Sequence, residues 1–347
     1  LALPSWGWTR VKELFMRMEG NASFSDQHHN TSGPLAVSNL QTTNPMSHAF
    51  VEAGQECQNA YNPDFNGDDQ EGVGFYQVTQ KDGKRFSSAR AFLDPVRKRS
   101  NLRIETGAQV ERVLFEGKKA VGVALKGRDL RLNPNGEVIL SGGAVNSPQL
   151  LRLSGIGPAE ELSRHGIDVK HDLPEVGANL ADHLDVTVMS SAKGRQPIGI
   201  ALSFIPRALK AAWSYVSKGK GEFTTNVGEA GGFVKSDPSR DRPNLQYHFI
   251  PAYLNDHGRK TSWGYGVTLH VCDLLPKSRG RIRLASADPK TKVVIEASYL
   301  SHPDDISVLL NGLKLARQIM NAPALASQTK AELLPGKEIQ TDEELIA

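Results

Sequence analysis

The chain has 347 residues, of which 39% are apolar and 23% charged, and its formal net charge is +3. This length allows two domains or one large one, and the composition excludes a disordered or fibrous protein. With 41 basic against 38 acidic residues, and its densest basic cluster only at residues 97–99, the chain is not expected to bind nucleic acid.

No apolar run is long enough to cross a membrane. The strongest runs, at 186–189 and 306–310, are far shorter than the ~20 residues of a transmembrane helix, so we expect no span, while peripheral membrane association stays open. Cys57 and Cys272 form no C-x-x-C pair, which favours neither a disulfide framework nor a zinc ribbon. Since no signal peptide is visible at the first residues either, we expect a cytoplasmic protein.

The first third of the chain predicts short elements separated by loops. A helical pattern of apolar residues covers 11–18, and polar turn residues at 20–34 predict a loop. Strands are predicted at 35–37 and 74–78, and a helix that begins at Ser87 should stop before Pro95.

The middle of the chain predicts a β-meander followed by a turn and a helix. Apolar segments at 102–104, 110–115 and 120–125 predict three antiparallel strands. A strand at 138–140 then leads into Ser141-Gly142-Gly143, and Ser147 should cap a helix that has Pro148 in its first turn.

In the second half, alternating apolar residues at 245–249, 265–271 and 282–284 predict a half-exposed antiparallel sheet. A helix follows, with Asp304 and Asp305 at its positive N-terminal end and an apolar stripe from Ile306 to Met320.

The strand, glycine turn and helix within 136–157 form the most informative stretch. Its glycines permit a ligand to approach the backbone, and the helix start offers free N–H groups. A tight connection without any ligand has the same pattern, so the spacing alone leaves both interpretations open.

A signature is present in this stretch. Gly143-Ala-x-x-Ser147-Pro148-x-Leu-Leu-x-x-Ser154-Gly155-Ile-Gly157 resembles the second signature of the glucose–methanol–choline flavoprotein oxidoreductases. The resemblance covers nearly the whole chain and is closest to choline-dehydrogenase-like alcohol dehydrogenases. Further segments match in the same order: Asn101-Leu to Val110-x-x-Val-Leu-Phe-Glu-Gly, Val176-Gly-x-Asn179-Leu-x-Asp182-His183, Glu229-Ala-Gly-Gly-Phe233, Ser278-Arg-Gly280 and Arg283-Leu-Ala-Ser-Ala-Asp-Pro289.

The resemblance implies α/β plus α+β architecture, in which an FAD-binding domain is interleaved with a substrate domain built on an antiparallel sheet. We expect mixed segments of both domains at 1–93, part of the FAD-binding domain at 94–185 and part of the substrate-binding domain at 186–347. No G-x-G-x-x-G occurs in the chain, and the family's catalytic histidine segment is expected beyond Ala347.

The implied reaction is FAD-dependent oxidation of a primary alcohol to an aldehyde by hydride transfer to the flavin, with a small-molecule alcohol as partner. Without the fingerprint and the histidine segment, we expect the residues given to be inactive on their own. Two alternatives remain: an inactive remnant or binding module of the same fold, and a lyase of the same family.

The resemblance also implies roles for five residues. Val110, Ser141 and Gly142 match cofactor-binding positions at the adenosine part of FAD, whereas Glu229 and His248 match positions on the substrate side. Without the resemblance, the sequence around these two residues predicts a solvated carboxylate at Glu229 and a half-buried strand residue at His248.

Other chemistries have weaker support. Asp182, His183 and Asp185 offer metal-ligand atoms, but neighbouring residues of an extended segment point to opposite faces, so we expect no metal. The chain contains no Gly-x-Ser-x-Gly, which disfavours a hydrolase.

Overall fold

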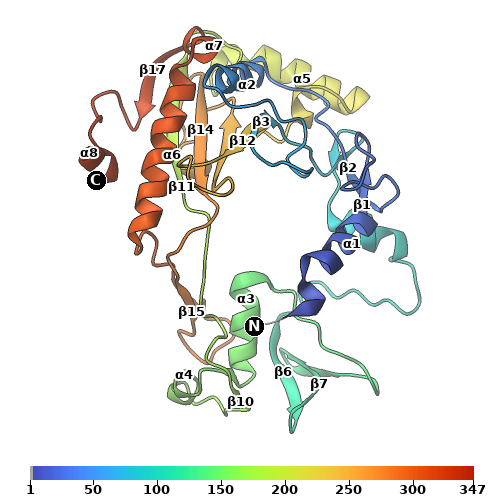
Figure 1. Cartoon of the computed structure of the whole chain (residues 1–347). Helices are drawn as coiled ribbons and strands as arrows, with labels where there is room; N and C mark the ends of the chain where they lie inside the picture. Colours follow the sequence, from blue (N-terminus) through green and yellow to red (C-terminus); the bar gives the residue numbers. More distant parts are fainter. Residues whose placement is uncertain (1–2) are drawn as a thin grey trace. The chain divides into compact units, whose positions relative to one another are not determined.

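The computed structural model describes residues 3–347, which divide into two compact units (Figure 1). Unit 1 combines the residues up to Leu102 with Leu184–Leu275 and Ile306–Ala347. Unit 2 combines Arg103–His183 with Pro276–Asp305. Each unit is thus assembled from separate stretches of chain. The assignment of the expected segments 1–93, 94–185 and 186–347 to FAD binding or to substrate binding stays a prediction.

A six-stranded antiparallel sheet forms the centre of unit 1. Its strand order is β17-β11-β14-β13-β12-β3, so the strands at its two edges come from opposite parts of the sequence. The strands are β3 (Gly72–Phe75), β11 (Asp185–Ala192), β12 (Ala230–Val234), β13 (Leu245–Ile250), β14 (Gly266–Asp273) and β17 (Thr329–Leu334).

Two helices help build the core of unit 1. Asn44 caps α2 (Pro45–Glu56) by accepting a hydrogen bond from the Met46 N–H, and Pro45 occupies the first turn, where its missing N–H costs nothing. The helix α6 (Pro303–Asn321) begins with two acidic residues, as its sequence predicts. Its stripe joins the core, which also contains Phe50 stacked on Phe249 with ring centroids 4.8 Å apart.

The prediction of a half-exposed sheet is wrong for β14, all eight residues of which are buried. Apolar side chains alternate along it as predicted, but the intervening residues are covered as well. Ile282 does not belong to this sheet, because it lies in β15 (Arg281–Arg283), which pairs only with β16 (Val294–Glu296) in unit 2.

The N-terminal helix α1 (Trp8–Met18) confirms the predicted helix, but the loop predicted from residue 20 begins later. Gly20 lies in β1 (Glu19–Asn21), which pairs in parallel with β2 (Leu35–Val37).

Two further elements of unit 1 end at other residues than predicted. β3 ends at Phe75 rather than at residue 78, and Pro95 lies inside a helical turn, η3. The other elements of unit 1 are η1 (Pro4–Trp6), β4 (Gln80–Lys81), β5 (Lys84–Arg85), η2 (Ala89–Leu93), η3 (Asp94–Val96), η4 (Leu202–Phe204), α5 (Ile205–Lys218), η5 (Glu222–Thr224), η6 (Asp256–Gly258), α7 (Pro323–Ala326) and α8 (Asp342–Ile346).

Unit 2 contains the predicted meander, shifted by one strand. β6 (Val110–Glu116) and β7 (Lys119–Leu125) are joined at the expected turn, and the third strand is β8 (Arg128–Arg131) rather than 102–104. The short parallel pair β9 (Ile156–Gly157) and β10 (His171–Asp172) and the helices α3 (Gly143–Leu153) and α4 (Ala159–Arg164) complete the unit.

The helix of the signature begins earlier than the sequence predicts. α3 starts at Gly143, so Pro148 lies inside it, and Ser147 is no cap: its Oγ instead accepts a hydrogen bond from the Gly142 N–H at 3.0 Å. The predicted strand at 138–140 is absent, because no strand of the described part of unit 2 pairs with it, and Ile139 is 82% exposed.

None of the helices that the structure describes combines the length and the apolar character required to cross a bilayer.

Candidate functional site

The three predicted cofactor residues lie around one pocket of unit 2. Val110, Ser141 and Gly142 all line a cavity of about 460 Å³ between the start of β6, the segment 138–142 and α3. Ile139 and Leu140 contribute apolar surface, and Asn146, Ser147 and Gln149 contribute polar groups. The sequence therefore identified residues that the fold brings together, although their role toward a cofactor stays a prediction.

Two glycines form the turn at the start of α3, and Gly142 lines this pocket. Gly143 has φ of +76°, a conformation that other residues rarely adopt, and a Cβ placed there would meet nothing within 4 Å. At Gly142 a Cβ would lie 3.1 Å from Asn146 Cβ and 3.2 Å from Ser147 Oγ. The first position gives a ligand room to approach the backbone, while the second lets the turn close onto the helix.

Glu229 is not the solvated carboxylate that its sequence neighbours suggest. It is 2% exposed and precedes β12. Oε2 accepts hydrogen bonds from the Asn44 N–H at 2.6 Å and the Ser47 hydroxyl at 2.8 Å, and Oε1 accepts one from the Thr225 hydroxyl at 2.6 Å. Because Asn44 and Ser47 belong to the start of α2, the helix dipole also stabilises this negative charge.

His248 lies half-buried on β13, opposite Gly231 on β12 and His270 on β14. Its Nδ1 is 3.7 Å from the Cys272 Sγ, and its ring centroid is 5.8 Å from that of Tyr76. Tyr76 donates a hydrogen bond to the Tyr247 carbonyl, and burial raises the pKa of Tyr76, so this phenol stays protonated. Glu229 immediately precedes β12, and His248 lies on the neighbouring strand β13.

A second histidine on this sheet was not identified from the sequence. His270 Nδ1 is hydrogen-bonded to the carboxylate of Asp185 on β11. A signal was present, because polar residues occupy alternate positions 246, 248, 268, 270 and 272 between the apolar ones. The even-numbered residues of β13 and β14 therefore share one polar face, which also carries Phe233 and lies next to Tyr76.

The predicted absence of a metal at Asp182, His183 and Asp185 stays a prediction, but the structure gives two of these residues other partners. Asp182 accepts a hydrogen bond from the Tyr299 hydroxyl at 2.7 Å, and Asp185 pairs with His270.

Among the described residues, one other group could hold a metal ion: Asp26, His29 and Asp64, whose ligand atoms lie within 4.8 Å of one another. Burial lowers the pKa of His29, but the carboxylates of Glu19 and Asp64, which accept hydrogen bonds from its ring, outweigh this effect and raise that pKa overall. A more basic ring favours the protonated, ion-paired state over metal ligation.

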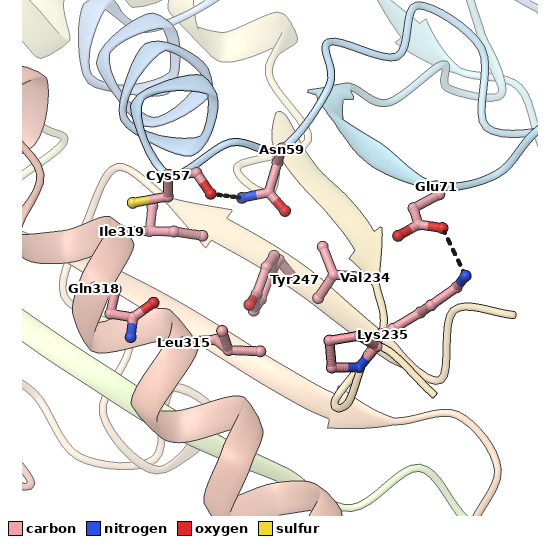
Figure 2. A pocket seen from close by; sticks show the side chains of 10 residues that line it. Cys57, Asn59, Glu71, Val234, Lys235, Tyr247, Leu315, Gln318 and Ile319 are labelled. Atoms are coloured by element: carbon pink, nitrogen blue, oxygen red, sulfur yellow. Dashed lines mark hydrogen bonds and ion pairs between the residues drawn. The ribbon is translucent and has the colours of Figure 1, made fainter. Parts of the chain in front are cut away.

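Figure 2 shows a smaller pocket of about 270 Å³, where the end of α2 and β12 meet α6. Its charged groups, Lys235 and Glu71, form an ion pair at 3.5 Å, and the remaining lining includes Tyr247, Leu315 and Ile319. None of the five predicted site residues lines this pocket. Its chemistry is accounted for by packing and one surface ion pair.

Comparison with known proteins identifies relatives over the whole chain. The sequence profile of the GMC oxidoreductases matches residues 2–185 and 276–347. An alcohol dehydrogenase [acceptor] from Pseudomonas putida is 56% identical over 99% of this chain and 63% of its own length. An oxygen-dependent choline dehydrogenase from Brucella anthropi is 37% identical over 98% of this chain and 62% of its own length. The chain thus spans less than two thirds of these relatives.

Solved structures give the same fold. Pyridoxine 4-oxidase from Mesorbium loti superposes with a TM-score of 0.84 at 25% identity, over 99% of this chain and 64% of that one. Formate oxidase superposes with a TM-score of 0.87 at 21% identity, over 99% and 66%, which shows the fold alone. The matched profile and the shared fold together show that this chain belongs to the GMC oxidoreductase family.

Proposed function

We propose that the protein is an FAD-dependent oxidoreductase that oxidises a primary alcohol to an aldehyde. The observation that carries the proposal is the pocket of unit 2, where the three residues matched to the family's cofactor positions meet beside a glycine turn. The 56% identity to an alcohol dehydrogenase [acceptor] supports an alcohol as the substrate class.

The residues of that pocket fit the adenosine part of FAD. Ser141 and Gly142 are exposed at the pocket, Asn146, Ser147 and Gln149 contribute polar groups, and Val110 lies beside them at the start of β6. In this proposal Val110, Ser141 and Gly142 hold the adenosine end. Bound FAD supplies the acceptor for the hydride that leaves the alcohol carbon.

The substrate side is assigned to the polar face of the six-stranded sheet. His248 and Tyr76 present polar atoms beside the apolar rings of Phe65 and Phe233, a combination suited to an alcohol with a hydrophobic body. His248 is proposed to line the site, and Glu229 to fix the edge of the sheet next to it. Proton abstraction is assigned to neither residue.

This arrangement favours an uncharged alcohol over choline. A quaternary ammonium group needs a carboxylate with free capacity together with aromatic faces. Both oxygens of Glu229 already accept hydrogen bonds from the chain itself, and the three residues before it, Asn226, Val227 and Gly228, offer no aromatic face.

The test is to mix the purified full-length protein, without oxygen, with benzyl alcohol, a medium-chain alkanol or choline. Reduction of the flavin is measured as the loss of its absorbance. We expect the two uncharged alcohols to reduce the flavin and to have kcat/KM values above that of choline, because this ratio reports differential transition-state binding. A higher kcat/KM for choline would refute the substrate assignment alone. A protein that retains flavin but is reduced by none of the alcohols would refute the proposed function.

A further inference from the structure

The helix α5 presents an apolar stripe to solvent. Leu202, just before it, and Ile205, Leu209, Trp213 and Val216 repeat at three- and four-residue intervals and therefore lie along one side, here called the α5 stripe. All five are exposed, Leu209 and Trp213 by 66% and Val216 by 84%. Figure 1 shows α5 in yellow at the periphery of unit 1.

The stripe is not the face by which α5 packs on its own unit. Ala211 is buried and lies about half a turn away from Leu209 and Trp213 on the helix. The helix is anchored separately, since Arg207 forms an ion pair with Glu222 at 2.7 Å and donates to the Arg195 carbonyl. The α5 stripe is therefore a second apolar face that the fold of unit 1 does not use.

Exposed apolar residues also lie in the segment before α5 and in the segment that pairs with it. Ile200 is 51% exposed and forms a β-bridge with Gly264, and Trp263 next to it is 73% exposed. Ser203 and Tyr265 are hydrogen-bonded at 2.8 Å, which ties the segment of Trp263 to the start of α5. Trp213 of the stripe and Trp263 are both exposed, and tryptophan is enriched where an apolar phase meets water.

The charged residues of the segment 193–221, which carries the stripe, are all basic, and the acidic residue that follows it, Glu222, is paired with Arg207. Residues 193–221 contain no acidic side chain, although the whole chain has nearly equal numbers of acids and bases. Lys210, Lys218 and Lys220 are exposed, and the Lys218 ammonium lies 5.7 Å from the ring centroid of Trp213. The basic residues of the stretch are Lys193, Arg195, Arg207, Lys210, Lys218 and Lys220.

We propose that the α5 stripe docks the protein onto an anionic lipid bilayer, with α5 lying in the plane of the interface. An apolar stripe with tryptophan, bordered by lysines, is the composition by which helices insert into the headgroup region. A second copy of the chain fits less well, because pairing two such faces brings like charges together.

The experiment is co-sedimentation of the purified full-length protein with phosphatidylcholine vesicles, with or without about 30% phosphatidylglycerol. We expect binding to the anionic vesicles that weakens as salt rises. Leu209→Ser and Trp213→Ser should each reduce this partition about tenfold, and Lys210→Glu with Lys220→Glu should reduce it on anionic vesicles only.

Trp8→Ser is the matched control, because Trp8 is 67% exposed on the helix α1, and it should leave partition unchanged. Melting curves establish that each variant is folded. The proposal is overturned if the protein does not bind anionic vesicles, or if the Trp8 and Trp213 variants lose binding equally. It is also overturned if sedimentation velocity shows a wild-type dimer that Leu209→Ser dissociates, while the wild type does not bind vesicles.

Discussion

The carboxylate of Glu229 joins two parts of unit 1 that are distant in sequence. Its partners come from the start of α2 and from the loop before β12, so one side chain fixes both the helix and the strand edge. Sequence reasoning on the residue alone predicted solvent exposure, because two of its three donors, Asn44 and Ser47, lie more than 180 positions away. Family resemblance identified the position but not this structural role.

We predict that Glu229→Ala lowers the free energy of unfolding by about 2–4 kcal/mol. The substitution leaves buried donors of Asn44, Ser47 and Thr225 without their acceptor, and unmade buried hydrogen bonds are costly. Urea unfolding of wild type and variant measures the difference. Glu52→Ala, at an exposed glutamate of α2, is the control and should change stability by less than about 0.5 kcal/mol. Equal effects of both substitutions would contradict the role given to Glu229.

At the scale of elements, periodicity predicted type better than boundaries. The strands β13 and β14 were predicted from the alternation of apolar residues. The burial of β13 follows that alternation as far as His248, whereas β14 is buried along its whole length. The start of α3 was misplaced, because Ser147 and Pro148 form a typical helix start but the glycine at 143 begins the helix one turn earlier. The segment 138–140 has strand composition, yet composition alone supplies no pairing partner.

We predict that Gly142→Val reduces FAD occupancy of the full-length protein to less than about half, because a β-branched side chain would crowd Ser147 and displace the turn. Released flavin, measured by absorbance against protein concentration, checks this. A melting curve must accompany it, since loss of flavin supports the placement only when the variant is folded. Full occupancy in the folded variant would show that the turn does not contact the cofactor.

At the scale of the whole molecule, a buried ion pair holds the two sequence segments of unit 2 together. Arg152 on α3 pairs with Glu161 on α4 at 2.9 Å and donates to the Val176 carbonyl. Burial lowers the pKa of Arg152, while the charge of Glu161 opposes that effect. Glu161 also accepts a hydrogen bond from the Leu284 N–H, which belongs to the second segment.

We predict that Glu161→Ala costs about 3–5 kcal/mol of folding stability, because it leaves the Arg152 guanidinium buried without a counter-charge. Glu160→Ala is a neighbouring control. The Glu160 side chain is 89% exposed, and its nearest basic partner, Arg164, is as far away as 3.9 Å. Loss of this exposed, loose ion pair should cost no more than about 0.5 kcal/mol. Chemical denaturation of the two variants distinguishes them, and similar midpoints would mean that the buried pair contributes little.

The order of the strands in the central sheet has a consequence for synthesis on the ribosome. β3 pairs with β12, which begins 155 positions after Phe75, and β11 acquires its outer neighbour β17 only near the end of the chain. At about 5–20 residues per second, translation leaves β3 without its partner for roughly 8–31 s. During that interval the apolar side of α2 and β3 is exposed on the nascent chain, and chaperones at the ribosome have time to bind it. Unit 1 therefore cannot fold before most of the chain has been synthesised.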